Sequence, residues 1–454
     1  MTSTLEAIPF AATPQTLEAA IALLGSGADS GSAVDPAARR AAFARYEAAP
    51  IPGTKPGRGW RHDYAQLPFD ELAWSSETLE LPATPPAVVE DAPKGDVPAM
   101  QTQAVAMLFH RGSSYVQIGD AGAVVRDPRL IVSSLADARR THGPMLERIL
   151  GRVVAADRFT ALASAFQNCG AFVYVPDGVV LDAPIQLSFA YDDDVDAAVF
   201  PQIVVVLGDG ARATVIERHH GNADPFVCGT VEVVAGEGAR CDYVAVQRTS
   251  EAARILMVRS ALAEHDATVA FHVAELGGTL VRSVITADLG STGANAEVSA
   301  LFFNTGFQHV DLTTTTEHAV GPTTSSTVVR TAASDRGQGR FFGNIAIREG
   351  AHGADASLRD DALLLSKRAH IDSVPALAIA ANDVRAFHGA TVGSLDEDAL
   401  FYASSRGIPR TEAVRMIALA FFEPAISRMP GDALREEIRT ALDDKIDAAT
   451  ELEA

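Results

Sequence analysis

Cysteine is scarce in this sequence, with 3 residues among 454. Cys169, Cys228 and Cys241 form no CxxC pair and no even-numbered set. A disulfide framework needs paired cysteines, and a thiolate metal site needs several of them close together, so neither is expected from this chain alone. This usage is typical of a reducing compartment, and we expect a cytoplasmic protein.

Positive charge and long apolar runs are also in short supply. Lysine and arginine together number 37 against 58 acidic residues, which gives a formal net charge of −21. So acidic a surface repels phosphate backbones and anionic lipid heads, and we expect neither nucleic acid nor a membrane surface as partner. No run of about 18 apolar residues occurs, and the first residues, MTSTLEAIPF, lack a basic head. We expect no signal peptide and no membrane span.

The familiar motifs of catalytic sites are absent as well. The sequence contains no P-loop, no zinc-protease HExxH, no nucleophile elbow and no CxxC pair. GQGRFFG at 337–343 resembles a dinucleotide-binding loop, but its last glycine lies one residue too far along and no βαβ pattern surrounds it. None of these motifs therefore indicates a reaction.

Aromatic residues make up only 6% of the chain, although 47% of it is hydrophobic. A core of Val, Ile, Leu and Ala suggests many thin, similar layers, and an internal repeat is present. Strand-like segments that begin with alanine start at residues 183, 211, 239, 267 and 294: APIQLSF, ARATVIE, ARCDYVA, ATVAFHV and ANAEVSA. Successive starts are 28, 28, 28 and 27 residues apart.

Within each segment the alanine and every second residue after it are mostly small or apolar, as in Ala267, Val269, Phe271 and Val273. This alternation gives one buried face per repeat. Since a single repeat cannot bury its own face and a stack can, the pattern predicts a solenoid, most naturally a parallel β-helix. A multi-sheet sandwich of unrelated hairpins is the alternative, although it does not require a fixed period.

Helical patterns follow the repeats. SLDE at 394–397 reads as a capping box that starts a helix, with Ser394 at the N-cap, and Gly407 is expected to end that helix. A second helix is expected from about Pro409 and a third from Asp432. The third carries an apolar stripe that predicts packing on its own domain, formed by Leu434, Ile438, Leu442 and Ile446.

One histidine lies where the strands give way to these helices. His388 stands within NDVRAFHGATVG and is followed at once by Gly389. The residues around it are small, which allows another chain to approach closely. The residue types alone favour a histidine that is satisfied inside the core, and a working imidazole is the alternative.

Several segments resemble the SufB/SufD family of SUF iron–sulfur cluster assembly proteins, and in particular its SufD branch. The most specific matches are LLLS at 363–366, HGATVG at 388–393 and LFYASSRGI at 400–408. AFVYVPDGVVLDAPI at 171–185 and GRFFGNIAI at 339–347 extend the resemblance over most of the chain. Members of the SufB branch typically carry Glu after the histidine and a cysteine about 28 residues before it, where this chain has Gly389 and Asp360.

The resemblance implies a fold and a set of partners. The fold is mainly β, a right-handed parallel β-helix over residues 156–393, with a mixed helical region over 1–155 and a helical domain over 394–454. The implied role is a non-catalytic scaffold that pairs with SufB and docks the ATPase SufC, with a homodimer possible when SufB is absent. An iron–sulfur cluster would be held transiently and shared with SufB, and this chain alone would hold no cofactor.

The resemblance also assigns site residues. His388 corresponds to the histidine proposed to act at the SufB interface, and it is our candidate ligand for iron or the nascent cluster. The expected SufC-docking residues lie on the helices that follow: Leu400, Phe401, Tyr402, Arg406, Ile417 and Phe421. Many SufD sequences have a cysteine two residues before the histidine, where this chain has Ala386, and a usual aspartate is replaced by Asn382. His388 would therefore act without a neighbouring thiol from its own chain.

A different class of function shares the predicted fold. Carbohydrate-active lyases and hydrolases are often built on a β-helix, with acidic and basic residues grouped on one exposed ridge. Such an enzyme usually carries a secretion signal and does not need the helical carboxy-terminal domain. The sequence therefore favours the scaffold over this alternative.

Overall fold

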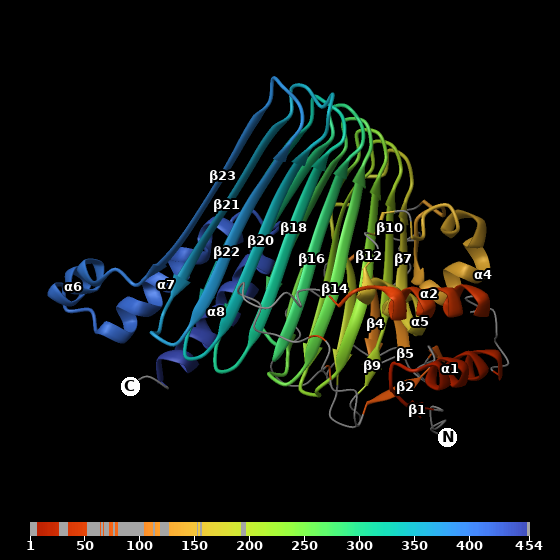
Figure 1. The fold of residues 1–454 in the computed structure, drawn as a ribbon, viewed down its shortest axis with the longest axis horizontal. Coiled ribbons are helices and arrows are strands. Elements are labelled where there is room, and N and C mark those ends of the chain that lie inside the picture. The colour runs from red at the N-terminus through yellow and green to blue at the C-terminus, as the bar shows by residue number, and fades with distance from the viewer. Residues whose placement is uncertain are drawn as a thin grey trace.

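The computed structural model describes residues 7–26, 35–51, 64, 67, 72–75, 78–79, 104–111, 114–118, 127–151, 153–154, 157–191 and 197–451. Most of these residues form a parallel β-solenoid of about eight turns, with helices at its amino- and carboxy-terminal ends. Figure 1 shows the strands stacked side by side along the long axis of the molecule. The predicted mainly β solenoid is confirmed.

Each turn of the solenoid contributes one strand to each of two sheets. The β22 sheet contains β7 (Cys169–Val175), β10 (Pro201–Leu207), β12 (Phe226–Ala235), β14 (Arg254–Ala263), β16 (Leu280–Leu289), β18 (His309–His318), β20 (Gln338–Ile347) and β22 (His370–Ile379). The β23 sheet contains β8 (Ile185–Tyr191), β11 (Arg212–Gly221), β13 (Arg240–Thr249), β15 (Thr268–Glu275), β17 (Asn295–Asn304), β19 (Thr324–Ala333), β21 (Asp355–Leu364) and β23 (Arg385–Ser394). Neighbouring strands within both sets pair in parallel.

The alanine repeat marks the strands of the β23 sheet. Ala211, Ala239 and Ala267 lie just ahead of β11, β13 and β15 and are at most 1% exposed. The turns before two of these strands contain Gly210 and Gly238 at φ +66° and +64°, a conformation that glycine adopts without strain. The repeat contains a second strand that the sequence pattern did not reveal, since β12, β14 and their equivalents form the opposite sheet.

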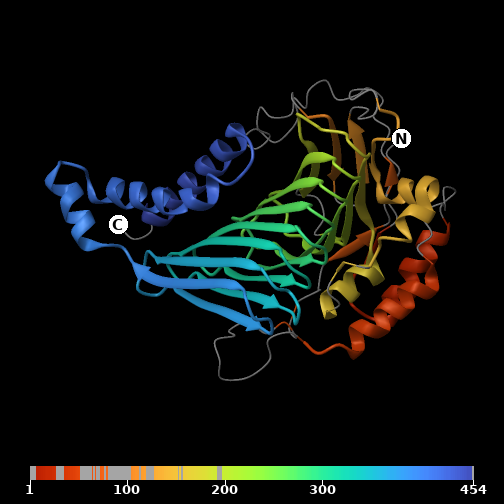
Figure 2. The same cartoon turned by 90° about the horizontal axis from the view of Figure 1, so that it is seen from above.

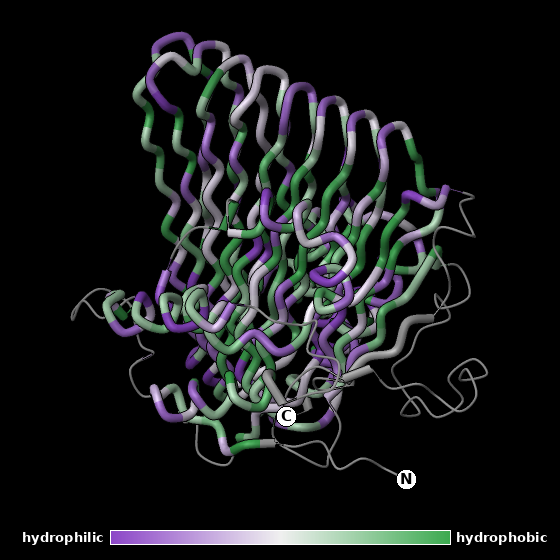
Figure 3. Tube along the Cα trace, turned by 90° about the vertical axis from the view of Figure 1, so that its right-hand side faces the viewer, coloured by the Kyte–Doolittle hydropathy of each residue, from purple (hydrophilic) through white to green (hydrophobic). Residues whose placement is uncertain are grey.

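The interior between the two sheets holds the main core. It is built mostly from Val, Ile, Leu and Ala, and residues such as Val205, Val233 and Ile255 are at most 1% exposed. Figure 3 shows hydrophilic and hydrophobic residues alternating along many strands, as expected when one face of each strand is turned inward. Cys241, two residues after the repeat alanine Ala239, lies in this interior at 0% exposure, as the alternation within the repeat predicts.

Amino-terminal elements cover the outer face of the β22 sheet. They include α1 (Pro14–Ser26), α2 (Pro36–Ala48), α4 (Leu135–Leu146) and α5 (Arg158–Phe166). Phe166 of α5 packs on Phe200 and near Phe10, while the indole N–H of Trp74 donates to the carbonyl of Phe166 at 2.7 Å. Arg39 of α2 is buried and donates to the end of α5 through the carbonyl oxygen of Ala165.

The first turn of the solenoid is also covered by additional strands. β6 (Ile131–Ser134) pairs antiparallel with β7, while β4 (Ala106–Arg111) pairs parallel with β8, extends the β23 sheet beyond it and pairs with β5 (Ser114–Ile118). The short strands β1 (Ala7–Pro9), β2 (Ala73–Ser75), β3 (Thr78–Leu79) and β9 (Ala198–Val199) complete this region. The amino-terminal end of the stack is therefore closed by additional strands and helices.

Carboxy-terminal helices cover the outer face of the β23 sheet. They are α7 (Arg410–Ile426) and α8 (Asp432–Glu451), and Figure 2 shows both on the opposite side of the stack from the amino-terminal helices. The preceding helix α6 (Glu397–Ser405) packs on α7. The predicted stripe on α8 is confirmed, because its four residues are 0% exposed and pack in one cluster with Leu301 and Phe303 of β17. No helix within the described ranges is long and apolar enough to cross a membrane.

One predicted helix start is wrong. Ser394 is the last residue of β23, where it pairs with Leu364, and the N-cap of α6 is Asp396. The Asp396 carboxylate accepts from the backbone N–H of Asp398 at 2.9 Å, so it does the capping that Ser394 was expected to do. The predicted end is confirmed, since α6 stops at Ser405 and Gly407 adopts φ +84°.

Candidate functional site

The carboxy-terminal end of the stack, formed by β22 and β23, is its open end. Among the described residues each of these strands pairs on one side only, with β20 and β21 respectively, so the other edge presents unpaired N–H and C=O groups. Large apolar side chains on both strands are exposed: Phe387 (59%), Val392 (49%), Val374 (43%) and Ile379 (43%). A group of exposed apolar side chains on a parallel edge is typical of a protein interface.

His388 lies on β23 at this open end. Its register partner on β21 is Leu358, a core residue that is 1% exposed, so His388 occupies a position that faces the interior in the preceding turn. No described strand stacks beyond the last turn, and His388 is exposed. It makes no hydrogen bond or ion pair within the described part of the chain. The interpretation of His388 as a satisfied core histidine is therefore wrong.

A buried carboxylate lies on β21, the strand that pairs with β23. Asp360 on β21 is 0% exposed, and the hydroxyl of Ser373 on β22 donates to its Oδ2. Burial raises the pKa of Asp360 to about 7, with a further contribution from Asp361, and this outweighs the hydrogen bond from Ser373. Its Oδ1 has no hydrogen-bond partner within the described residues. Leaving a buried polar atom unpaired costs about 1–3 kcal/mol, and more when the group is charged.

Sequence reasoning gave Asp360 no functional role, although the sequence held a signal for it. Along DASLRDDALL the inward-facing positions are Ala356, Leu358, Asp360 and Ala362, all buried. A carboxylate in such an alternating apolar series is unusual, because an isolated charge is costly in a core. The neighbouring Asp361 faces outward and is satisfied, since it accepts from Thr391 at 2.7 Å and pairs with Arg330 at 2.8 Å.

The thiols lie away from the open end. Cys169, Cys228 and Cys241 are buried on β7, β12 and β13, and burial raises the pKa of the Cys228 and Cys241 thiols. Within the described residues no group of three or more His, Cys, Asp or Glu side chains could hold a metal ion. None of the three described cysteines lies on β22 or β23 at the open end.

The residues expected to dock SufC divide into two layers. Phe401 and Tyr402 on α6 are 76% and 61% exposed, and the exposed Arg406 lies 5.1 Å from the centre of the Tyr402 ring. Figure 1 shows α6 projecting beyond the strands, clear of the solenoid. These three side chains form the α6 surface, which is aromatic and carries one positive charge.

The other three expected residues lie beneath or beside that surface. Leu400 is 1% exposed and packs with Ala413 of α7, while Ile417 is half-buried against the same cluster. Phe421 is half-buried near Phe422, under the guanidinium of Arg330 at 5.7 Å. Met416 is 54% exposed on α7, and sequence reasoning missed it because nothing in the helical pattern distinguishes it.

Other buried charges in the interior satisfy one another. Glu217 is 0% exposed and pairs with Arg259 at 3.1 Å and with His219 at 2.6 Å, while the Tyr243 hydroxyl donates to it at 2.7 Å. Burial would raise the pKa of Glu217, but the charge of Arg259 and the contact with His219 lower it. The side chain of His219 contacts Tyr191 and faces the opposite way from that of the adjacent His220, which contacts Ser188.

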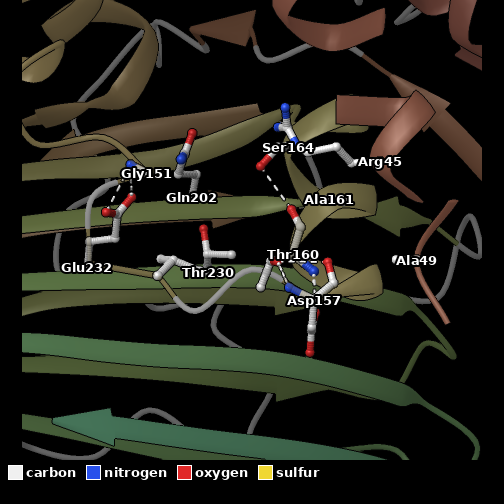
Figure 4. A pocket seen from close by; sticks show the side chains of 11 residues that line it. Arg45, Ala49, Gly151, Asp157, Thr160, Ala161, Ser164, Gln202, Thr230 and Glu232 are labelled. Carbon is white, nitrogen blue, oxygen red and sulfur yellow. Dashed lines mark hydrogen bonds between the residues drawn. The ribbon is translucent and has the colours of Figure 1, made fainter. Parts of the chain in front are cut away.

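A cavity of about 270 Å³ lies between α5 and the β22 sheet. Figure 4 shows the Glu232 carboxylate turned toward the backbone N–H of Gly151, which donates to it at 2.9 Å. Asp157 caps α5 through the Thr160 N–H at 2.8 Å and also accepts from Arg282. Both carboxylates in this cavity already stabilise local structure, so it is a weaker candidate site than the open end.

Comparison with known proteins gives a consistent result. Residues 189–421 match the family model "SUF system FeS cluster assembly, SufBD core domain", and residues 28–187 match "SufBD protein N-terminal region". The chain is 27% identical over 329 residues to the iron–sulfur cluster assembly protein SufD of Bacillus subtilis, covering 71% of this chain and 75% of the relative. It is 23% identical over 382 residues to SufB of the same organism, covering 82% of each. A SufBD family protein of Mycobacterium leprae is 28% identical over 282 residues, which cover 62% of this chain and 32% of that protein.

Proposed function

This chain belongs to the SufB/SufD family of iron–sulfur cluster assembly proteins, and we propose that it acts as a SufD-type scaffold subunit. The observation that carries the proposal is the open end, where exposed Phe387 and Val392 lie on an unpaired strand edge beside an exposed His388. The family assignment favours this role over the polysaccharide-cleaving alternative.

SufB is the proposed partner of the open end. SufB and SufD relatives both match this chain over most of its length, so a SufB solenoid would present a similar terminal turn. When the terminal strands of two solenoids lie edge to edge, they form main-chain hydrogen bonds, and burial of the apolar side chains around them adds to the stability of the pair. Without SufB, the same edge is available to a second copy of this chain, which accounts for the proposed homodimer.

The cargo at this interface is the nascent iron–sulfur cluster. Neutral imidazole is a borderline ligand for iron that a proton or sulfide can displace, which suits a site that must release what it holds. His388 is the proposed ligand from this chain. The thiolates would come from SufB, because the described cysteines of this chain are buried far from β23.

SufC is the proposed partner of the α6 surface. Phe401, Tyr402 and Arg406 would contact the ATPase, since aromatic residues and Arg are enriched at interface centres. Leu400 supports them from below by fixing α6 on α7. Ile417 and Phe421 would contribute through their exposed parts, and α7 would transmit SufC movement to the solenoid because it packs on β17 and β19.

The test is native mass spectrometry after co-expression of this chain with SufB and SufC from one source. We expect an assembly with one copy of this chain, one SufB and two SufC. Phe387→Glu should remove SufB, and Phe401→Glu should remove a SufC. Phe307→Glu is the matched control, because Phe307 is 76% exposed on the turn between β17 and β18. A chain that stays alone with both partners present would contradict the proposal.

His388 is tested separately from assembly. His388→Ala should lower the yield of reconstituted cluster while leaving the assembly intact, because the residue is exposed and holds no other described side chain in place. The control is His352→Ala, an exposed histidine in the turn between β20 and β21. Full cluster yield from the His388 variant would show that this imidazole plays no part in assembly of the cluster.

A further inference from the structure

The register places two potential metal ligands in the same inward-facing layer at the open end. On β21 the layer contains Leu358 and Asp360, whose partners on β23 are His388 and Ala390. Parallel strands lie about 4.8 Å apart and two residues advance about 6.6 Å along a strand, so Asp360 and His388 are diagonal neighbours roughly 8 Å apart at Cα. This separation allows two side chains to reach one ion.

The Asp360 carboxylate is directed toward the last turn. Its Oδ2 accepts from Ser373, which lies on β22, the terminal strand of the opposite sheet. Its Oδ1 is fully buried and has no hydrogen-bond partner among the described residues. Buried polar atoms are nearly always paired, so this oxygen requires a ligand, a water molecule or a proton.

On the side of the open end, only a small side chain lies next to Asp360. The residue next to it on β23 is Ala390, whose side chain is a single methyl group, and Ala390 is exposed. On the inner side the adjacent residue is Val329 of β19, which is 0% exposed and belongs to the core. A ligand of Asp360 would therefore arrive from the open end and not from the interior.

We propose that Asp360 and His388, with the hydroxyl of Ser373 beside them, form a binding site for a divalent first-row cation, Fe²⁺ in the cell. The inference rests on the proposed function, which brings iron to this end. Carboxylate, hydroxyl and imidazole donors suit such an ion before sulfide and thiolate replace them. Two firm ligands leave several coordination positions open, so the ion can pass to ligands from SufB.

The site is tested with the full-length chain in the absence of oxygen, with Co²⁺ as a spectroscopic probe and Fe²⁺ as its competitor. Wild type should bind one Co²⁺ with ligand-field absorption, and Fe²⁺ should displace it. Asp360→Asn and His388→Ala should each weaken Co²⁺ binding at least tenfold. Asp372→Asn, an outward-facing carboxylate on β22 that pairs with His370, should change it less than twofold.

A fold measurement and one further variant separate a lost ligand from a lost fold. Asp360→Asn keeps the shape of the side chain, and far-ultraviolet circular dichroism should be unchanged. Ala390→Leu leaves all three donors in place but covers Asp360, so it should also weaken Co²⁺ binding tenfold or more. Three results would each overturn the site. They are Co²⁺ binding that Asp360→Asn does not weaken, Co²⁺ binding that Asp372→Asn weakens as strongly as Asp360→Asn does, and no Co²⁺ binding by wild type.

Failure of this inference is distinguishable from failure of the proposed function. If the assembly with SufB and SufC forms while Co²⁺ binding ignores Asp360, only the cation site is overturned. If the assembly does not form, the scaffold role itself is contradicted, whatever Co²⁺ does.

Discussion

Each end of the solenoid has a histidine in an inward-facing position, but one histidine is buried and the other is exposed. At the closed end His110 of β4 is 0% exposed and stacks on Phe189 of β8 at 4.6 Å between ring centres. Burial lowers the pKa of His110 to about 3, so this imidazole stays neutral. At the open end His388 has the core residue Leu358 as its neighbour on one side and no described strand on the other.

This difference shows which elements cover the end of a solenoid. A stack of parallel turns leaves an unsatisfied edge and an uncovered layer at each end. Here the closed end is covered by β4, β5 and β6 from the same chain, while the open end presents the same kind of layer to solvent. The closed end contributes stability to the isolated chain, and the open end is the surface that we propose for a partner.

The largest expected effect contrasts phenylalanines from the two ends. Phe189→Ala should cost about 3–5 kcal/mol of unfolding free energy, because it empties a site that is 0% exposed between two imidazole rings. Phe387→Ala should stay within about 0.5 kcal/mol in the isolated chain. Urea unfolding followed by circular dichroism measures both. Equal losses would contradict the contrast between the ends.

A smaller effect concerns the covered face of the β23 sheet. The ammonium of Lys445 on α8 donates to the carbonyl of Leu276 at 2.6 Å and to Gln308 at 2.7 Å. Burial lowers the pKa of Lys445 to about 7, although the charge of Glu251 opposes this. Between this value and the ordinary pKa of 10.5 the unfolded chain binds more protons than the folded chain. Stability therefore rises with pH over that window.

Relative to Lys445→Met, wild type should gain roughly 2 kcal/mol of unfolding free energy between pH 7 and pH 9. Lys367→Met is the control, because Lys367 is exposed and should show no such gain. Chemical unfolding at both pH values gives the comparison. If the unfolding free energies of wild type and Lys445→Met change equally between the two pH values, the Lys445 ammonium is not buried.

The smallest effect lies just beyond the open end, in the cap of α6. Asp396→Ala should destabilise this helix by about 1 kcal/mol, because it removes the acceptor for the first free N–H groups. Ser394→Ala should leave the helix unchanged, since Ser394 belongs to β23. Hydrogen exchange of residues 397–405 distinguishes the two. Faster exchange in the Ser394 variant would favour the capping box expected from the sequence.

Half of the solenoid could be predicted from the sequence, for a physical reason. Strands of the β23 sheet begin at a regularly spaced alanine and alternate in polarity, so they are visible as a repeat. Strands such as β12 and β14 are buried on both faces, because Cys228 and Leu256 face outward into the cluster beneath the amino-terminal helices. Strands covered on both sides lose the alternation on which the prediction depends.

The candidate site was predictable only in part for a similar reason. The motif HGATVG identified His388. The exposure of His388 depends on whether another strand stacks on β23, and the sequence pattern does not show where the stack ends. Leu400 could not be told from Phe401 and Tyr402 until α7 was seen to pack beneath α6. Asp360 required the register of β21, which shows that it faces inward.

The central claim is that the open end is the surface that meets SufB. The most direct measurement is hydrogen exchange with mass spectrometry on the chain alone and after addition of purified SufB. We predict slower exchange in β22 and β23, over residues 370–394, with no change in β6, β7 and β8. Slower exchange confined to the closed end, or a stable complex without any protection of β22 and β23, would contradict the claim.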